Sequence, residues 1–177
     1  MHHTQVHKES QFFHSDFAHS DYNTKTSSVS WESPSFDGIR VVGQGSVPVR
    51  LWLSTNAGQT ECTATLSSVS GGKSTTLCSA SANTAKRAKD EHPVTLPGDD
   101  MMRTSMSGGF AVLMTMDLKL KQVVRLAKGD RLRLDISGGG GAEDDVNHRI
   151  WHNPKWQSSI ELNINEAVEL KWAPATA

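Results

Sequence analysis

Apolar residues recur at every second position from Phe110 to Leu120, and mostly polar or smaller residues fill the positions between them. A second alternation of the same kind runs from Leu132 to Ile136, where charged residues lie between the apolar ones. A period of two places alternate side chains on opposite faces of a β-strand. The turn residues Lys128-Gly129-Asp130 precede the second alternation. We therefore predict two antiparallel strands joined by a short connection, each with one buried and one wet face.

Strand signals continue along most of the chain after Trp31. They fall at 38–42, 47–54, 61–69, 75–80, 92–96, 122–126, 159–164 and 167–172. Clusters of Gly, Pro, Asn, Asp and Ser separate them, as expected for turns, and only 82–89 could form a helical turn. Roughly eight or nine short strands with almost no helix predict an all-β sandwich or barrel.

Two cysteines, Cys62 and Cys78, flank a predicted hairpin whose turn is Ser70-Gly71-Gly72-Lys73. A register that sets Leu66 opposite Leu77 keeps two apolar residues on one face. The same register places the two cysteines on opposite faces, because a step of one residue changes the face. It favours two free thiols, although a cross-strand disulfide stays open at this point.

Residues 1–30 differ in composition from the remainder, being rich in His, Ser, Asp and Thr and poor in aliphatic residues. Such a composition is typical of an extended arm rather than of a core. The expected organisation is an arm at 1–30, a β-sandwich at 31–173 and a tail at 174–177. The apolar contacts of the arm are expected to come from Phe12, Phe13, Phe17 and Tyr22.

Composition excludes several classes of partner. The formal net charge is −1, so no basic surface suited to nucleic acid or to an anionic membrane is predicted. No apolar run approaches the roughly 20 residues of a membrane span. The N-terminus lacks the apolar region of a secretory signal. We expect no nucleic-acid partner and no membrane partner, and the localisation stays open.

Three segments resemble one known domain. Residues 49–57 (VRLWLSTNA), 126–137 (LAKGDRLRLDIS) and 146–154 running into 159–162 (VNHRIWHNP, SIEL) are similar, in order and spacing, to the C-terminal jelly-roll (galactose-binding-like) domain of the X-Pro dipeptidyl-peptidase and cocaine-esterase hydrolase family. The chain departs from that pattern at the loop 138–145 and at the last turn, 155–159. The resemblance implies an antiparallel jelly-roll β-sandwich.

The resemblance also implies that the sandwich is not the catalytic part. In that family the Ser-His-Asp machinery belongs to a separate α/β-hydrolase domain. This sequence contains no G-x-S-x-G elbow and no strand-to-helix alternation that could hold one. We therefore predict no catalytic residues, no cofactor and no enzymatic activity for this chain.

Three motifs suggest chemistry but have simpler explanations. The letters Gly71-Gly72-Lys73-Ser74-Thr75 lack the first glycine of a phosphate loop, and a hairpin turn is favoured. Five histidines of the arm lack the rigid tetrahedral set of a zinc site. Whether the acidic loop Glu143-Asp144-Asp145 binds calcium stays open, since the D-x-D-x-D-G register is absent. No metal site is predicted.

The densest group of aromatic and imidazole side chains offers a candidate ligand site. An exposed Trp can serve as a platform for a sugar ring or as an interface anchor, and packing against the sheet is the alternative. The other tryptophans, Trp31, Trp52 and Trp172, are expected to be partly buried at sheet margins. The candidate residues are His148, Trp151, His152 and Trp156.

Function is therefore expected to be structural. The arm and the missing active site favour a non-catalytic assembly protein, concretely a virion component such as a capsid decoration protein whose arm contacts neighbouring subunits, by analogy of fold. The expected partner is a second copy of the chain or a larger protein assembly. The alternatives are a carbohydrate-binding module with a glycan as ligand, and an accessory domain of a serine hydrolase.

Overall fold

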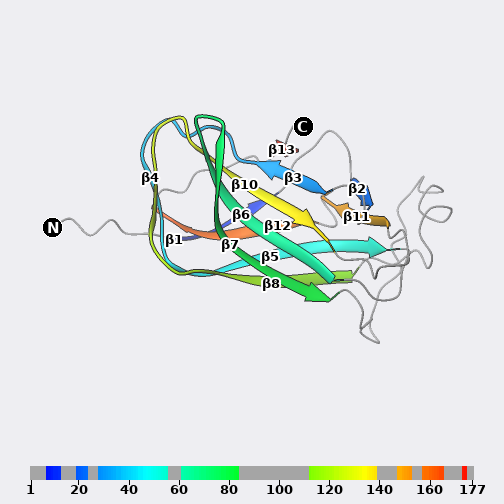
Figure 1. Ribbon diagram of the computed structural model, residues 1–177. Helices are drawn as coiled ribbons and strands as arrows, with labels where there is room; N and C mark the ends of the chain where they lie inside the picture. Colours follow the sequence, from blue (N-terminus) through cyan, green and yellow to red (C-terminus); the bar gives the residue numbers. More distant parts are fainter. Residues whose placement is uncertain are drawn as a thin grey trace.

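The computed structural model describes residues 7–12, 19–23, 28–55, 61–83, 112–138, 147–152, 157–165 and 173–174. Within these residues every strand pairing is antiparallel, and no helix occurs. The strands form two sheets that face each other (Figure 1). The prediction of an all-β sandwich is confirmed. The jelly-roll connectivity that the resemblance implied stays a prediction.

The first sheet has eight strands. They are β1 (His7–Phe12), β2 (His19–Asn23), β4 (Arg40–Val42), β5 (Gly45–Thr55), β8 (Val112–Leu120), β9 (Val124–Leu126), β11 (Asn147–Trp151) and β12 (Ser159–Ile164). The second sheet has five strands in the order β13-β3-β10-β6-β7. They are β3 (Val29–Glu32), β6 (Glu61–Ser70), β7 (Lys73–Asn83), β10 (Arg131–Ser137) and β13 (Ala173–Pro174).

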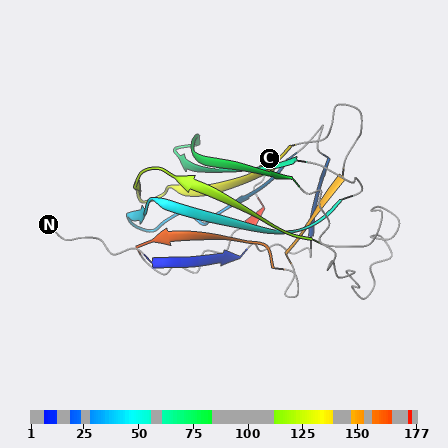
Figure 2. The ribbon, with the colours of Figure 1, turned by 90° about the horizontal axis from the view of Figure 1, so that it is seen from below.

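The eight strands of the first sheet behave as four long, interrupted ones. β4 and β5 follow each other in one line, and β9 and β8 pair with them in succession on one side. On the other side β12 and β11 pair with the same line, and β1 and β2 in turn pair with β12 and β11. Figure 2 shows β1, β12, β5 and β8 lying side by side as one layer. Between the Val42–Val124 pair and the Gly45–Leu120 pair the register changes by one residue, as at a β-bulge.

The core is built from the inward positions of both sheets. In β10 the burial alternates, with Leu132, Leu134 and Ile136 fully buried and the residues between them partly or largely exposed. In β8 the alternate residues from Met114 to Leu120 are buried in the same way. Fully burying one such side chain contributes about 1.5–3 kcal/mol. The alternation predicted from the sequence is confirmed for both strands.

The two alternating strands are nevertheless not partners. β8 pairs with β5 in the first sheet, whereas β10 pairs with β3 and β6 in the second. β9 continues the first sheet before the turn, so the Lys128-Gly129-Asp130 turn carries the chain across the core from one sheet to the other. Both apolar rows are buried because they face each other from opposite sides of the same core.

The crossing turn is held by specific hydrogen bonds. The Gly129 amide donates to the Phe36 carbonyl at 2.8 Å, and the Phe36 amide donates to the Asp130 carbonyl at 2.9 Å. Gly129 has φ +92°, which a residue with a Cβ rarely adopts. The Ala127 amide donates to Asp130 Oδ2 at 2.8 Å. Hydrogen bonds from the Ser70 hydroxyl and from the Ala127 amide lower the pKa of Asp130 below its usual value.

The hairpin of β6 and β7 has the predicted turn, with Ser70 paired to Lys73 and positive φ values at Gly71 and Gly72. Positive φ at both central residues is the type I′ geometry that suits a two-residue hairpin. The residues Gly71-Gly72-Lys73-Ser74-Thr75 therefore form an ordinary hairpin turn and the start of β7, and not a phosphate loop.

Farther from the turn, the predicted register is wrong. A bulge after Leu66 sets that residue opposite Cys78 and leaves Leu77 as the extra residue. Cys62 and Cys78 consequently lie on the same buried face, not on opposite faces. Neither cysteine forms a disulfide all the same. Cys78 pairs with Leu66, four positions from Cys62, a separation of ~13 Å along the strand, and a disulfide cannot span it.

Strands cross both boundaries that composition suggested. β1 and β2 lie within the expected arm at 1–30 but pair with β12 and β11 of the chain's own first sheet. The boundary between residues 30 and 31 falls inside β3, and the boundary between 173 and 174 falls inside β13. Hydrogen bonding between backbones explains this, because a polar strand can pair with a sheet edge without contributing to the core.

The predictions for the tryptophans, the helical turn and two of the strands agree with the structure only in part. Trp31 is fully buried in the core instead of lying partly buried at a margin, while Trp52 is half-buried on the central strand β5. Ala82 and Asn83 extend β7, so the expected helical turn does not begin there. The strands expected at 92–96 and 167–172, and Trp172 with them, lie outside the described residues.

Ellman's reagent should react with neither cysteine of the folded protein and with both after unfolding. Cys62 is fully buried, and burial raises the pKa of the Cys78 thiol to about 11, so little thiolate forms at neutral pH. A Lys73→Cys variant, with a thiol at the exposed hairpin turn, is the matched control and should react at once. A Cys62–Cys78 linked peptide in non-reducing mass spectrometry would contradict the described register.

Asp130→Asn should lower the free energy of unfolding at neutral pH and leave it nearly unchanged in acid. The folded-state pKa of Asp130 is depressed, so its contribution is present above the unfolded value of about 4 and disappears as the pH falls through the folded value. Chemical denaturation of both proteins from pH 2 to 7 measures the difference. Ser70→Ala should remove part of the same effect, since the Ser70 hydroxyl is the largest cause of the shift.

Candidate functional site

Of the predicted group of aromatic and imidazole residues, His148 and Trp151 belong to β11, and His152 follows its last residue. His148 pairs through its backbone with Tyr22 of β2 and with Thr55 of β5. Trp151 is 1% exposed and His152 is 8% exposed. Trp156 and the side chain of His148 lie outside the described residues, as do Phe13, Phe17 and the side chains of Phe12 and Tyr22.

Trp151 and His152 are held by contacts within the fold. The Ser158 hydroxyl donates to the Trp151 carbonyl at 2.6 Å and accepts from the Trp52 amide at 3.0 Å. It therefore joins β5 to the loop between β11 and β12. The imidazole ring of His152 meets the ring of Trp31 edge to face, with centroids 6.2 Å apart. This arrangement is that of packed side chains.

Neither described ring offers an open face. A sugar ring must stack on an exposed aromatic surface, and Trp151 and His152 are both buried. Packing, which the sequence left as the alternative, accounts for these two residues. A ligand-binding role for the whole group stays a prediction that no described contact supports.

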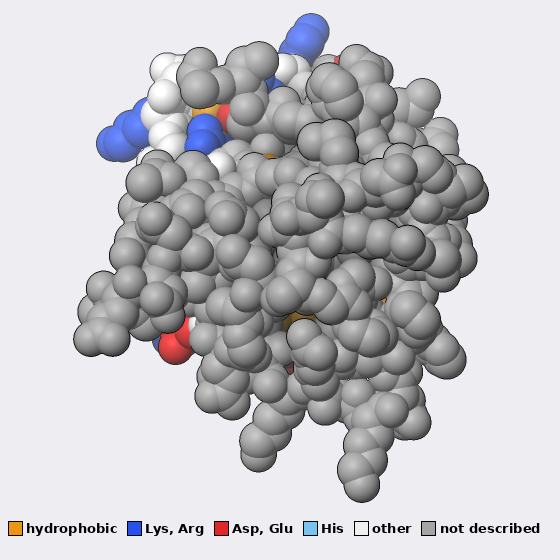
Figure 3. All heavy atoms as spheres, turned by 90° about the vertical axis from the view of Figure 1, so that its right-hand side faces the viewer, with side chains coloured by type: hydrophobic (Ala, Val, Ile, Leu, Met, Phe, Trp, Pro, Cys, Tyr) orange, Lys and Arg blue, Asp and Glu red, His pale blue; other side chains and the backbone are white. Residues whose placement is uncertain are grey.

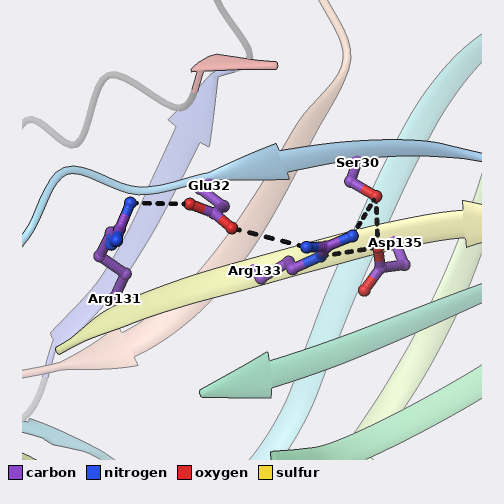
Figure 4. A network of polar contacts seen from close by, with 5 residues as sticks. All are labelled: Ser30, Glu32, Arg131, Arg133 and Asp135. Atoms are coloured by element: carbon purple, nitrogen blue, oxygen red, sulfur yellow. Dashed lines mark hydrogen bonds and ion pairs between the residues drawn. The ribbon is translucent and has the colours of Figure 1, made fainter. Parts of the chain in front are cut away.

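The most connected polar arrangement of the described residues lies on the outer face of the second sheet (Figure 4). We call it the β3–β10 cluster. Its residues are Ser30, Glu32, Arg131, Arg133 and Asp135.

Arg133 is the centre of this cluster. Its Nε donates to Asp135 Oδ1 at 2.9 Å, and its Nη2 donates to the Ser30 hydroxyl at 3.1 Å. Its Nη1 lies 3.6 Å from Glu32 Oε1, while Arg131 Nη1 donates to Glu32 Oε2 at 3.0 Å. The Ser30 hydroxyl also donates to the Asp135 carboxylate. Because Arg133 faces Glu32 and Asp135 faces Ser30 across the ladder, the cluster supports the β3–β10 register.

The contacts of this cluster join β3 to β10 and so stabilise the second sheet. Both carboxylates are engaged by guanidinium groups, and Ser30 bonds to a carboxylate instead of to an imidazole base. The cluster contains no histidine, the side chain that most often acts as the general base for a nucleophile. The sequence predicts that the polar residues of 131–135 lie on the exposed face of a strand. It does not predict that they contact Ser30 and Glu32, because the pairing with β3 appears only in the structure.

A second ion pair joins two of the three segments that carry the family resemblance. Arg50, in the VRLWLSTNA segment, lies 3.6 Å from Glu161, in the SIEL segment. These residues come from β5 and β12, where Arg50 pairs with Ser159. The remaining segment, 126–137, supplies β10 and the β10 residues of the cluster. The resembling residues thus serve the frame of the sandwich.

Metal binding finds no support within the described residues. They contain no group of three or more His, Cys, Asp or Glu side chains placed to hold a metal ion. The arm histidines and the acidic loop Glu143-Asp144-Asp145 fall outside the described side chains, so those two possibilities stay as predictions. The described part of the chain also contains no helix able to cross a membrane.

The end of the sandwich at the right of Figure 1 is seen face-on in Figure 3. Among the described side chains visible there, Lys and Arg groups gather near the upper left margin and acidic atoms lie at the lower left. Described hydrophobic side chains show only as small areas in this view.

Comparison with known proteins places the fold. No protein-family model matches the sequence, and no curated protein sequence matches it. Among solved structures, a CocE/NonD family hydrolase from Staphylococcus aureus is similar over 90% of this chain, with a TM-score of 0.64 and 12% identity. A second structure described in the same way gives a TM-score of 0.66 and 13% identity.

Two further hydrolases share the fold at similar identity. An aminopeptidase from a marine sediment Thaumarchaeota archaeon matches 80% of this chain with a TM-score of 0.59 and 12% identity. An alpha-amino acid ester hydrolase matches 79% with a TM-score of 0.58 and 12% identity. The chain spans only 37% of the first hydrolase and 26% of each of these two. The shared part is therefore a partial domain of each larger protein.

A double-mutant cycle on Glu32→Gln and Arg133→Met should give a coupling energy of about 0.5–1 kcal/mol, typical of partly exposed pairs. The side chains of Glu32 and Arg133 are 21% and 35% exposed, so solvent screens the pair incompletely. Urea denaturation of the four proteins measures it. The Asp117–Lys119 pair, more exposed at 45% and 65%, is the control and should couple more weakly. Equal coupling in both pairs would show that the cluster adds nothing beyond a surface ion pair.

Proposed function

We propose that this chain is a non-catalytic β-sandwich that accompanies the α/β-hydrolase domain of a CocE/NonD-type hydrolase. The observation that carries the proposal is the similarity of 90% of this chain to about a third, 37%, of a CocE/NonD family hydrolase. The sandwich would act beside the catalytic domain, which lies on the same polypeptide or on another one.

The residues that carry the sequence resemblance support the same proposal. The segments 49–57 and 126–137 contain most of β5 and the whole of β10, and residues 146–154 and 159–162 contain β11 and most of β12. Their polar side chains form the Arg50–Glu161 pair and supply Arg131, Arg133 and Asp135 to the β3–β10 cluster. A frame built from the resembling residues is what an accessory domain would retain.

The described residues give no competing catalytic proposal. Each carboxylate of the β3–β10 cluster is engaged by an arginine, and Cys62 and Cys78 are buried and form no disulfide. Burial raises the pKa of Cys78, which makes its thiol a poor nucleophile at neutral pH. The reacting groups would therefore come from the hydrolase domain.

The virion and carbohydrate-binding hypotheses receive less support. The arm that suggested contacts between subunits contributes β1 and β2 to the chain's own sheet. Trp151, the first candidate for a sugar platform, is buried. Neither hypothesis has a described contact in its favour, so the accessory domain is preferred.

An active-site probe tests this proposal. The isolated 177-residue chain should not react with a fluorophosphonate probe, which labels the activated serine of serine hydrolases. In extracts of the source cells, size-exclusion chromatography should show the chain bound to a probe-labelled polypeptide or continuous with one. Probe labelling of a serine within the isolated chain would contradict the non-catalytic role. Elution of the chain without any labelled polypeptide would contradict the association.

A further inference from the structure

Exposed large hydrophobic side chains of the described residues all belong to one side of the sandwich. They are Ile39, Leu113 and Val123, which are 52%, 46% and 57% exposed. Leu113 lies in β8, and the other two immediately precede β4 and β9, which are strands of the same first sheet. Arg40 and Val124, which follow Ile39 and Val123, pack inward. Alternation therefore places Ile39 and Val123 on the outer face.

Leu113 does not stand alone on this face. It lies directly opposite Trp52 of β5, which is half-buried between two buried leucines and so belongs to the outer face as well. Pro48 and Arg50 occupy the preceding outward positions of β5. At the other end of the same face, the partly buried Val41 pairs with Arg125 between Ile39 and Val123.

Charged pairs lie between the two apolar ends. Arg50 meets Glu161 across β5 and β12, and Lys119 meets Asp117 along β8. The bond from Lys119, followed by the bond from the Ser46 hydroxyl, lowers the pKa of Asp117, so this carboxylate stays ionised. Apolar side chains interspersed with satisfied charges of both signs are typical of an interface between domains, which is more polar than a core.

The outer face of the second sheet has a different composition. Apart from Val69, the described outward positions of β3, β6, β7 and β10 are charged or hydroxyl-bearing. Hydroxyl groups face each other between β6 and β7, and the Thr63 and Ser81 hydroxyls bond at 2.7 Å. The β3–β10 cluster covers the other half. This composition is that of a face in contact with water.

From this asymmetry we propose that the outer face of the first sheet, around Leu113 and Trp52, is the contact surface for the hydrolase catalytic domain. The inference rests on the proposed function and adds which side of the sandwich meets the partner. The occupant follows from the comparisons, because the shared fold is only 26% to 37% of each hydrolase, and the remainder of such a protein must contact the sandwich somewhere. Among the described residues, only the first sheet exposes large apolar side chains that such a contact would bury.

Site-specific photo-crosslinking tests the proposal in the source cells. The photoreactive amino acid p-benzoylphenylalanine replaces Leu113 in one variant and Thr65, on the outer face of the second sheet, in the matched control. After irradiation and digestion, mass spectrometry identifies the linked peptide. The expected result is a peptide from a fluorophosphonate-labelled hydrolase domain, linked at least tenfold more from position 113 than from position 65.

The other outcomes overturn one claim or the other. A hydrolase peptide linked mainly from position 65, or equally from both positions, would place the contact elsewhere and overturn this inference alone. So would a hydrolase that co-elutes with the chain but links from neither position. A peptide of a second copy of this chain at position 113 would make the face a self-association surface. Absence of any probe-labelled hydrolase in the co-eluting fractions would overturn the proposed function itself.

A charge at the same position gives an independent measurement. Leu113→Asp should reduce the amount of probe-labelled hydrolase that co-elutes with the chain by about tenfold, while Thr65→Asp should leave it unchanged. Circular dichroism melting of both variants checks the fold, and exposure of 46% at Leu113 makes the substitution tolerable in the isolated chain. Retention of the full amount of hydrolase by a folded Leu113→Asp variant would overturn the inference.

Discussion

Burial of two facing apolar rows is the interaction on which the remainder of this structure depends. The inward residues of β10 in one sheet and those of β5, β8 and β12 in the other form one core, whose members are almost all fully buried. Each sheet has only one apolar side, so neither can be stable without the other. Every other feature, including the crossing turn and the outer polar clusters, is placed by the way these rows meet.

The polar residues specify details that the core leaves free. A sandwich core excludes water but tolerates small shifts of register, whereas cross-strand pairs on the outer faces favour one register. The β3–β10 cluster acts in this way on the second sheet, and the Arg50–Glu161 pair acts on the first. The resemblance to a hydrolase-associated sandwich rests on the segments that contain these residues. Under the proposed function, chemistry beyond stabilisation would be supplied by the hydrolase domain.

The two outer faces differ in a way that bears on function. Hydroxyl groups and satisfied charges cover the second sheet, while the first sheet exposes Leu113 beside Trp52, and Ile39 and Val123 are exposed at opposite ends of the β4–β9 ladder. Exposed apolar side chains on a sheet face are removed from water most readily by another protein surface. A sandwich with one wet face and one mixed face is well suited to pack against the side of a larger partner.

Periodicity in the sequence was sufficient to predict an antiparallel sandwich, the inward residues of β8 and β10 and the Gly71-Gly72 hairpin, because these depend on local alternation and on backbone conformation. It could not predict that β8 and β10 lie in different sheets, since alternation does not name the partner strand. The bulge after Leu66, which reversed the relation of the two cysteines, depends on packing between strands. The burial of Trp151 and the cluster around Arg133 were likewise decided by tertiary structure, because side chains distant in sequence must meet before a tryptophan is covered or an arginine finds its carboxylates.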